Sequence, residues 1–173
     1  MKYLFSVLAL SLLMSPLQAG DAEKKLEELG IKLFKPSAPI ANYVRAVRTG
    51  NLVFTAGHGP SNAEGEYIKG KVGKDLTWEE GNEAARVTAI ALLSTLKAEL
   101  GDLDKVKRIV KVTGMVNATP EFTKQSQVIN GCSDLLVAVF GKEKGKHARA
   151  AIGMASLPIG MAVEIEMIVE VED

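Results

Sequence analysis

Two long stretches of helical periodicity, each lying between β-rich segments, constrain the fold of this chain most strongly. The first opens with the capping box Thr77-Trp78-Glu79-Glu80 and stops at Gly101. The second is predicted to start at Thr119-Pro120, as N-cap and first helical residue, and to end at Gly141. In both stretches apolar residues recur three and four positions apart, which predicts two amphipathic helices, each with one face buried.

The segments around these helices are predicted to be strands. They are residues 41–47 and 51–56, joined by a tight turn, then 106–116, 148–155 and 163–171. The resulting order, ββ-α-β-α-ββ, predicts an α+β fold, an α/β sandwich with both helices on one face of a mixed sheet. The other face of the sheet is then left bare, and we expect an oligomer to cover it.

Charged residues interrupt the apolar pattern of the last two strands. Arg149 lies among small residues, whereas Glu164 and Glu166 alternate with apolar residues and therefore share one face. If these strands form a hairpin around residues 157–160, Arg149 lies opposite about Val169, roughly 16 Å from Glu164. The two charges then meet only if another subunit supplies one of them. The alternative is that the glutamates line a solvated face and Arg149 is a surface residue.

Composition excludes several classes of function. The 173 residues include 21 Lys+Arg and 21 Asp+Glu, so no net positive charge favours binding to nucleic acid. With one cysteine and two histidines, the chain offers neither a disulfide framework nor a multi-cysteine or histidine-rich metal site. Cys132 lies on the apolar face of the second helix, and we expect it to be a core residue.

The first nineteen residues resemble a secretory signal peptide. Lys2 precedes an apolar core of about eleven residues, shorter than the roughly twenty that span a membrane. A buried strand or helix is the alternative. We expect cleavage after Ala19, a single domain over residues 20–173, an exported periplasmic or secreted protein, and no stable membrane association after cleavage. Residues 21–29 are charged and helix-prone, and Gly30 ends them.

Several segments resemble the RidA/YjgF family, also labelled the endoribonuclease L-PSP family. The C-terminal signature consists of Gly-Lys-His-Ala-Arg149-Ala-Ala-Ile-Gly, then Leu157-Pro158, then Val163-Glu164-Ile165-Glu166. Asn42-Tyr43-Val44 and residues 50–57 resemble the opening hairpin of that family, and residues 129–136 resemble a longer subgroup. The resemblance extends from about residue 40 to residue 171, in the family's order.

This resemblance implies a chorismate-mutase-like fold, a homotrimer and ligand sites in the clefts between subunits. Characterised members hydrolyse reactive enamines and imines to 2-oxo acids and ammonia without a metal or cofactor. By position, Arg149 corresponds to the arginine that binds the substrate carboxylate, and Glu164 to the acid that directs water. Among the remaining positions, Tyr43 corresponds to a pocket tyrosine, Ala151 to a residue whose backbone contacts the ligand, and Gly57 follows the pocket strand.

The chain departs from the family pattern at the pocket strand and at the pocket asparagine. Ala56-Gly57-His58 stands where Ser-Gly-Gln is common, and Asn130 and Ser133 compete for the asparagine's role. His58 is either a pocket group or a turn histidine bonded to nearby backbone, and His147 is expected at the surface or the sheet edge. The predicted partner is a small carboxylate-bearing molecule rather than nucleic acid. The alternatives to a deaminase are a non-catalytic carboxylate-binding module and, less favoured, a ribonuclease or translation inhibitor.

Overall fold

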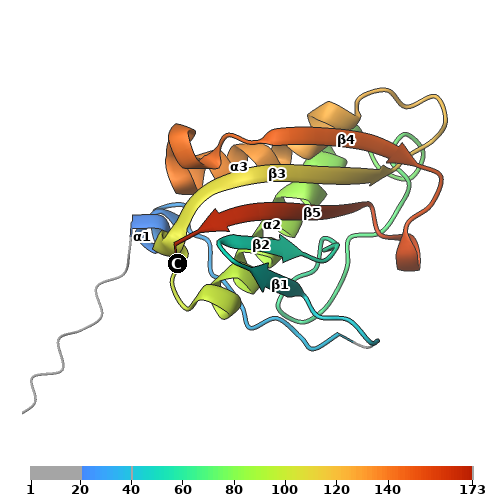
Figure 1. Ribbon diagram of the computed structural model, residues 1–173. Helices are drawn as coiled ribbons and strands as arrows, with labels where there is room; N and C mark the ends of the chain where they lie inside the picture. Colours follow the sequence, from blue (N-terminus) through green and yellow to red (C-terminus); the bar gives the residue numbers. More distant parts are fainter. Residues whose placement is uncertain (1–20, 40, 173) are drawn as a thin grey trace, which may run out of the picture.

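The structure is a computed structural model that describes residues 21–39 and 41–172 (Figure 1). The predicted signal peptide lies outside the described residues. None of the helices in the described part is long and apolar enough to cross a membrane. In chain order the elements are α1 (Asp21–Glu28), β1 (Ala46–Thr49), β2 (Leu52–Thr55), α2 (Trp78–Leu100), the 3-10 turn η1 (Leu103–Lys105), β3 (Val106–Asn117), α3 (Gln125–Gly145), β4 (Ala148–Met154), the 3-10 turn η2 (Pro158–Gly160) and β5 (Val163–Val171).

The strands form one mixed sheet in the order β1-β2-β5-β3-β4. β3 runs parallel to β4 and antiparallel to β5. The prediction that the last two strands pair as a hairpin is therefore wrong, because β3 lies between them. The chain leaves β4 at the edge of the sheet, passes through η2 and crosses over the end of β3 before it enters β5.

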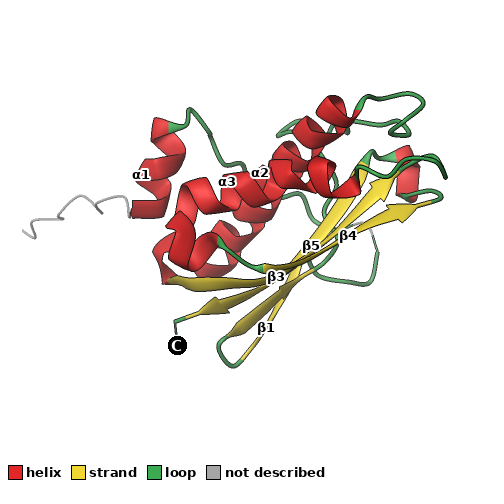
Figure 2. Cartoon of the chain, turned by 90° about the horizontal axis from the view of Figure 1, so that it is seen from above, coloured by secondary structure: helices red, strands yellow, loops and turns green. Residues whose placement is uncertain are grey.

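The helices lie on one side of this sheet, as Figure 2 shows, and the opposite side is bare. The α+β sandwich predicted from the periodicity is thus confirmed. β5 alternates strictly: Val163, Ile165 and Met167 are buried beneath the helices, whereas Glu164 and Glu166 point to the bare face. Apolar side chains also remain exposed on strands of the bare face, among them Val47, Phe54 and Ile152.

Helix α2 begins and ends as its sequence predicts. The Thr77 side chain accepts a hydrogen bond from the Glu80 backbone N–H, and the Glu80 carboxylate accepts one from the Thr77 N–H. Gly101 ends the helix with a φ of 74°, a conformation that glycine adopts without steric cost. α2 packs closely against α3 at Gly131, where an added Cβ would stand 2.0 Å from the Asn82 carbonyl oxygen.

The predicted start of α3 is wrong. The backbone N–H groups of Ala118 and Thr119 donate to the carbonyls of Met154 and Val72, so both are committed to neighbouring segments rather than to a helix. The helix begins at Gln125, with no side-chain cap from Lys124. Gly141 interrupts it at a φ of 75°, as the sequence indicates, and a final turn continues to Gly145.

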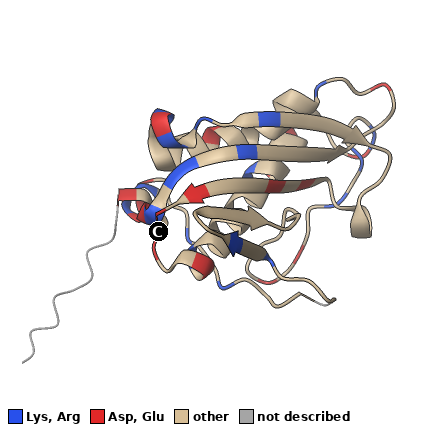
Figure 3. Ribbon diagram, viewed as in Figure 1, with Lys and Arg blue, Asp and Glu red and all other residues tan. Residues whose placement is uncertain are grey.

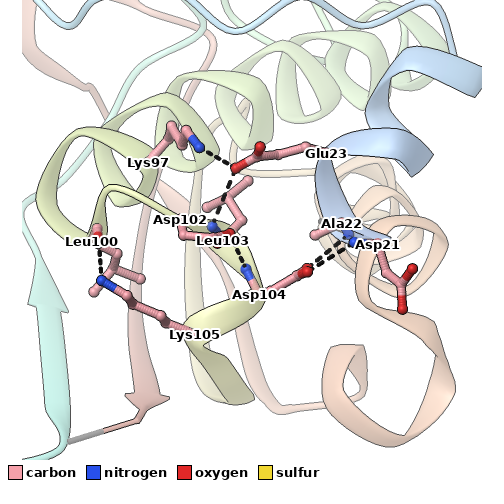
Figure 4. A network of polar contacts seen from close by, with 9 residues as sticks. All are labelled: Asp21, Ala22, Glu23, Lys97, Leu100, Asp102, Leu103, Asp104 and Lys105. Carbon is pink, nitrogen blue, oxygen red and sulfur yellow. Dashed lines mark hydrogen bonds and ion pairs between the residues drawn. The ribbon is translucent and has the colours of Figure 1, made fainter. Parts of the chain in front are cut away.

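Helix α1 is fixed to the end of α2 by a polar network (Figure 4). The Asp104 carboxylate accepts hydrogen bonds from the backbone N–H groups of Asp21 (2.8 Å) and Ala22 (3.0 Å), so it caps the first turn of α1. Glu23 forms an ion pair with Lys97 of α2. The charged segment predicted to be helical is therefore an integral part of the domain.

Candidate active site

Arg149 projects from the helix-facing side of the edge strand β4. It lies in register with Val112 of β3, whose side chain is fully buried under the helices. One guanidinium nitrogen, Nη1, donates to Asn130 Oδ1 (2.8 Å) and to Ser133 Oγ (3.0 Å). These two residues lie one turn apart on α3, so both side chains reach the same guanidinium. Nε and Nη2 have no hydrogen-bond partner in the described part of the chain, and Arg149 as a residue is exposed.

His147 belongs to the same cluster. Its Nε2 lies 3.0 Å from Ser133 Oγ, and its Nδ1 lies 2.7 Å from the Gly145 carbonyl oxygen. Burial lowers the pKa of His147 below 6.5, and the positive charge of Arg149 lowers it further, whereas the bond to Gly145 opposes both effects. The sequence predicts this histidine at the surface or the sheet edge, whereas in the structure it is half-buried. It stands two residues before Arg149, just ahead of β4, and the side-to-side alternation of an extended segment is the signal that would have placed it beside the arginine.

Ala151 follows Arg149 on the same face of β4 and packs against the core. Cys132 lies beneath the cluster on α3, and burial raises the pKa of its thiol to about 12. The prediction that Cys132 is a core residue is confirmed. Four of the residues singled out from the sequence, Arg149, Asn130, Ser133 and Ala151, are thus carried by the same two elements, β4 and α3.

Glu164 and Gly57 form a second cluster on the bare face of the sheet. A Cβ built at Gly57 would stand 2.1 Å from Glu164 Oε1, so the carboxylate lies directly against the Gly57 backbone. Partial burial raises the pKa of Glu164, and the neighbouring charge of Glu166 raises it further. A carboxyl group with a raised pKa is suited to exchange protons near neutral pH.

Tyr43 and Ala56 are placed near the start of the hairpin formed by β1 and β2. Tyr43 lies in the exposed segment that precedes β1, where its N–H donates to the Ala41 carbonyl in a tight turn. This turn explains why β1 starts at Ala46 and not at residue 41 as predicted. Ala56 follows β2 and pairs through its N–H with the Arg45 carbonyl.

The structure does not bring His58 to Glu164. The imidazole is 3% exposed and lies under α2, with Nε2 2.8 Å from Thr95 Oγ1 and Nδ1 2.8 Å from the Ala56 carbonyl oxygen. Burial is the main cause of its lowered pKa, so the ring is neutral at pH 7. The sequence allows either a pocket histidine or a turn histidine bonded to nearby backbone, and this placement agrees with the second.

Arg149 and Glu164 therefore occupy opposite faces of one sheet. Arg149 lies level with Met167 of β5, three residues along from Glu164, and β3 lies between the two strands. From strand spacing, the two Cα atoms are about 14 Å apart. A hollow of about 530 Å³ between α1 and α2, and another of about 180 Å³ beside His58, are lined by neither residue. Within the described residues, no group of three His, Cys, Asp or Glu side chains is placed to hold a metal ion.

Charges of both signs are interspersed over the strands and helices, as Figure 3 shows. The basic residues of β3, Lys107, Arg108 and Lys111, lie on a strand that pairs with β5, which carries Glu164, Glu166 and Glu170. Charged residues therefore form local clusters. Two of these clusters, around Arg149 and around Glu164, contain residues of the sequence signature.

The family model described as endoribonuclease L-PSP matches residues 35–171. The chain belongs to this family, which is also known as RidA/YjgF. Protein TCP17 of Trypanosoma cruzi is 46% identical over 160 residues, which cover 92% of this chain and all of that protein.

Solved structures agree with this assignment. The crystal structure of Atu1372 from Agrobacterium tumefaciens, a protein of unknown function, is 43% identical with a TM-score of 0.80, and the match covers 88% of this chain and 94% of that one. A crystal structure from Shewanella oneidensis is 27% identical with a TM-score of 0.84, and the match covers 88% of this chain and all of that one. The fold is therefore that of the L-PSP family, the chorismate-mutase-like arrangement expected from the sequence signature.

Proposed function

We propose that this L-PSP family member hydrolyses reactive 2-imino and 2-enamino acids to 2-oxo acids and ammonia, in clefts between the subunits of a homotrimer. The observation that carries the proposal is the placement of Arg149 and Glu164 on opposite faces of one sheet. A single chain cannot direct both groups at one small molecule. Two copies can, if the β4 edge of one lies against the bare face of the next.

The exposed apolar residues of the bare face support such an assembly. Phe54 is 40% exposed, Ile152 45% and Val47 54%, and the sheet register places all three on this face. Burial of this surface against a second copy would contribute about 25 cal/mol for each Å² of apolar area removed from water. A closed ring of three identical contacts leaves no copy of the surface exposed.

In this arrangement Arg149 binds the substrate carboxylate. Asn130 and Ser133 accept hydrogen bonds from Nη1. Nε and Nη2 are left as a planar pair of donors for two parallel hydrogen bonds to the carboxylate. The bound carboxylate positions the adjacent imine carbon toward the facing subunit.

Glu164 of that facing subunit supplies the proton transfers. Its carboxylate takes a proton from water as the water oxygen bonds to the imine carbon and delivers that proton to the imine nitrogen, which gives a neutral carbinolamine. The carboxylate then takes the proton of the carbinolamine hydroxyl and passes it to nitrogen as the carbon–nitrogen bond breaks, so that ammonia leaves and the 2-oxo acid remains. Partial burial and the charge of Glu166 raise the pKa of Glu164, which makes its carboxylate a stronger base than that of an ordinary glutamate.

The test is release of a 2-oxo acid from an imine generated in situ by an amino-acid oxidase. We expect hydrolysis faster than the spontaneous rate. Loss of two charge-assisted hydrogen bonds in Arg149→Ala costs about 3 kcal/mol or more, a decrease in kcat/KM of at least about 100-fold. Arg86→Ala, which removes a partly exposed arginine of α2, is the matched control. A wild-type rate equal to the spontaneous rate would contradict the proposal.

A second candidate function is non-catalytic binding of small carboxylates in the same cleft. It is favoured by Ala56, which has no hydroxyl, and by His58, which is turned away from Glu164. Isothermal titration calorimetry with a 2-oxo acid distinguishes the two, because binding without turnover of the imine supports this alternative. Ribonuclease activity is less favoured, since neutral net charge provides no general attraction for RNA.

We also propose that the mature protein is exported and begins at Gly20. The support is the basic, apolar and small-residue pattern of residues 1–19. N-terminal sequencing of the protein purified from its own cell envelope or medium tests this proposal. An intact Met1 on the exported protein would contradict it.

A further inference from the structure

Ser133, His147 and Gly145 form a chain of hydrogen bonds beside Arg149 that the deaminase mechanism does not use. The Gly145 carbonyl can only accept, so His147 Nδ1 carries the ring proton in the bond of 2.7 Å. Nε2 of the neutral ring then has a lone pair and accepts from the Ser133 hydroxyl at 3.0 Å. A hydroxyl, a base within hydrogen-bond distance and a third group that orients the base constitute the arrangement of an activated nucleophile.

The charges around these hydrogen bonds favour ionisation of the Ser133 hydroxyl. Arg149 Nη1 donates to Ser133 Oγ at 3.0 Å, and a cationic donor stabilises negative charge on that oxygen. Burial, and to a smaller extent the charge of Arg149, lower the pKa of His147, so the ring stays a base in the resting state. Ser133 and His147 are both half-buried, whereas Arg149 beside them is exposed, so the hydroxyl lies next to an accessible anion-binding group.

We propose that Ser133 is a nucleophile, with His147 as its general base, toward activated esters and thioesters of small acids whose free carboxylate binds Arg149. The inference rests on the carboxylate-binding role of Arg149 in the proposed function. It assigns to the same site an acyl-transfer activity that needs neither Glu164 nor ammonia release.

The covalent step balances within these groups. Ser133 Oγ bonds to the acyl carbon while its proton passes to His147 Nε2, and the guanidinium charge of Arg149, whose Nη1 lies 3.0 Å from Ser133 Oγ, stabilises the carbonyl oxygen that becomes negative. The bond between the acyl carbon and the leaving oxygen or sulfur then breaks, and the leaving group takes the proton from Nε2. Water repeats the sequence on the acyl-serine, with His147 as base, and releases the free acid.

The same contacts have a purely structural interpretation, in which Ser133 and His147 only hold Arg149 in place. Full-length mature protein incubated with mono-para-nitrophenyl succinate separates the two. We expect a burst of para-nitrophenolate and a succinyl group on the peptide that contains Ser133, identified by mass spectrometry. The uncharged ester para-nitrophenyl butyrate should react at least about 10-fold more slowly, because Arg149 provides it with no anchor.

Variants complete the experiment. Ser133→Ala should abolish the adduct, and His147→Gln should slow acylation by about 100-fold, the usual contribution of a general base. Ser126→Ala, which removes an exposed serine of the same helix, should react as wild type. If Ser133→Ala is poorly folded by circular dichroism, the adduct site in wild type and the His147→Gln rate still decide the outcome.

The results for the two proposals are separable. Deamination without a Ser133 adduct overturns this inference and leaves the proposed function standing. Acylation of Ser133 without deamination supports the inference and contradicts the proposed function. Succinylation confined to lysines, equal in wild type and Ser133→Ala, also overturns the inference.

Discussion

The Glu164 carboxylate lies directly against the backbone of Gly57, with Oε1 2.1 Å from the position of an added Cβ. Two residues more than one hundred positions apart in the sequence are thus interdependent. Any side chain at position 57 must displace the carboxyl group that the proposed mechanism uses for proton transfer.

We therefore predict that Gly57→Ala lowers deamination while the domain remains folded. The conflicting atoms belong to a flexible side chain that can turn aside, so the steric conflict should cost about 0.5–1.5 kcal/mol of unfolding free energy. The same substitution made in Glu164→Ala should cost less, because the conflicting carboxylate is absent. Urea unfolding of the four proteins of this double-mutant cycle measures the difference. Equal costs in the two backgrounds would show that the contact with Glu164 is not what excludes a side chain.

The bare face of the sheet yields a prediction about assembly. Phe54→Asp places a charge among apolar residues that the proposed trimer buries, and a buried unpaired charge is costly. We expect sedimentation velocity to show monomers for this variant and trimers for the wild type. Leu29→Asp, at an exposed apolar position just after α1, is the control and should remain trimeric. A monomeric wild type would contradict the proposed assembly.

His58 provides a pH-dependent test of the fold. Because burial lowers its folded-state pKa below 6.5, the neutral ring stabilises the fold fully above pH 6.5. That contribution is lost as the pH falls through the folded-state pKa. The nearby charged group, Arg45, acts in the same direction. Unfolding free energy should therefore fall more steeply from pH 7.5 to pH 5 in wild type than in His58→Gln. Parallel pH profiles for the two proteins would contradict the buried, neutral assignment.

The sequence predicted most of the fold because local signals dominate there. The capping box at Thr77 and the glycine at position 101 bound α2, and the strict alternation over 163–171 gives β5 its limits. Local sequence does not reveal the start of α3, because Thr119, a good N-cap before a proline, donates its backbone N–H to the Val72 carbonyl instead of opening a helix. Tertiary hydrogen bonds of this kind leave no mark on local sequence.

Prediction of the site was limited by strand order. Arg149 and Glu164 could be identified as the unusual charges, but whether β4 pairs with β5 or with β3 depends on long-range packing. The sequence allows two positions for His58, since a strand end can direct its side chain to either layer. His147 was assigned to the surface because its partner Ser133 is fourteen residues away on a different element.

The central claim is that each active site takes Arg149 from one subunit and Glu164 from another. It is tested most directly by unfolding equal amounts of Arg149→Ala and Glu164→Ala together, refolding them and measuring imine hydrolysis. In randomly mixed trimers half of the subunits keep Arg149 and half keep Glu164, so about a quarter of the sites receive both. The account predicts about a quarter of wild-type activity from two inactive parents. A mixture as inactive as its parents would contradict it.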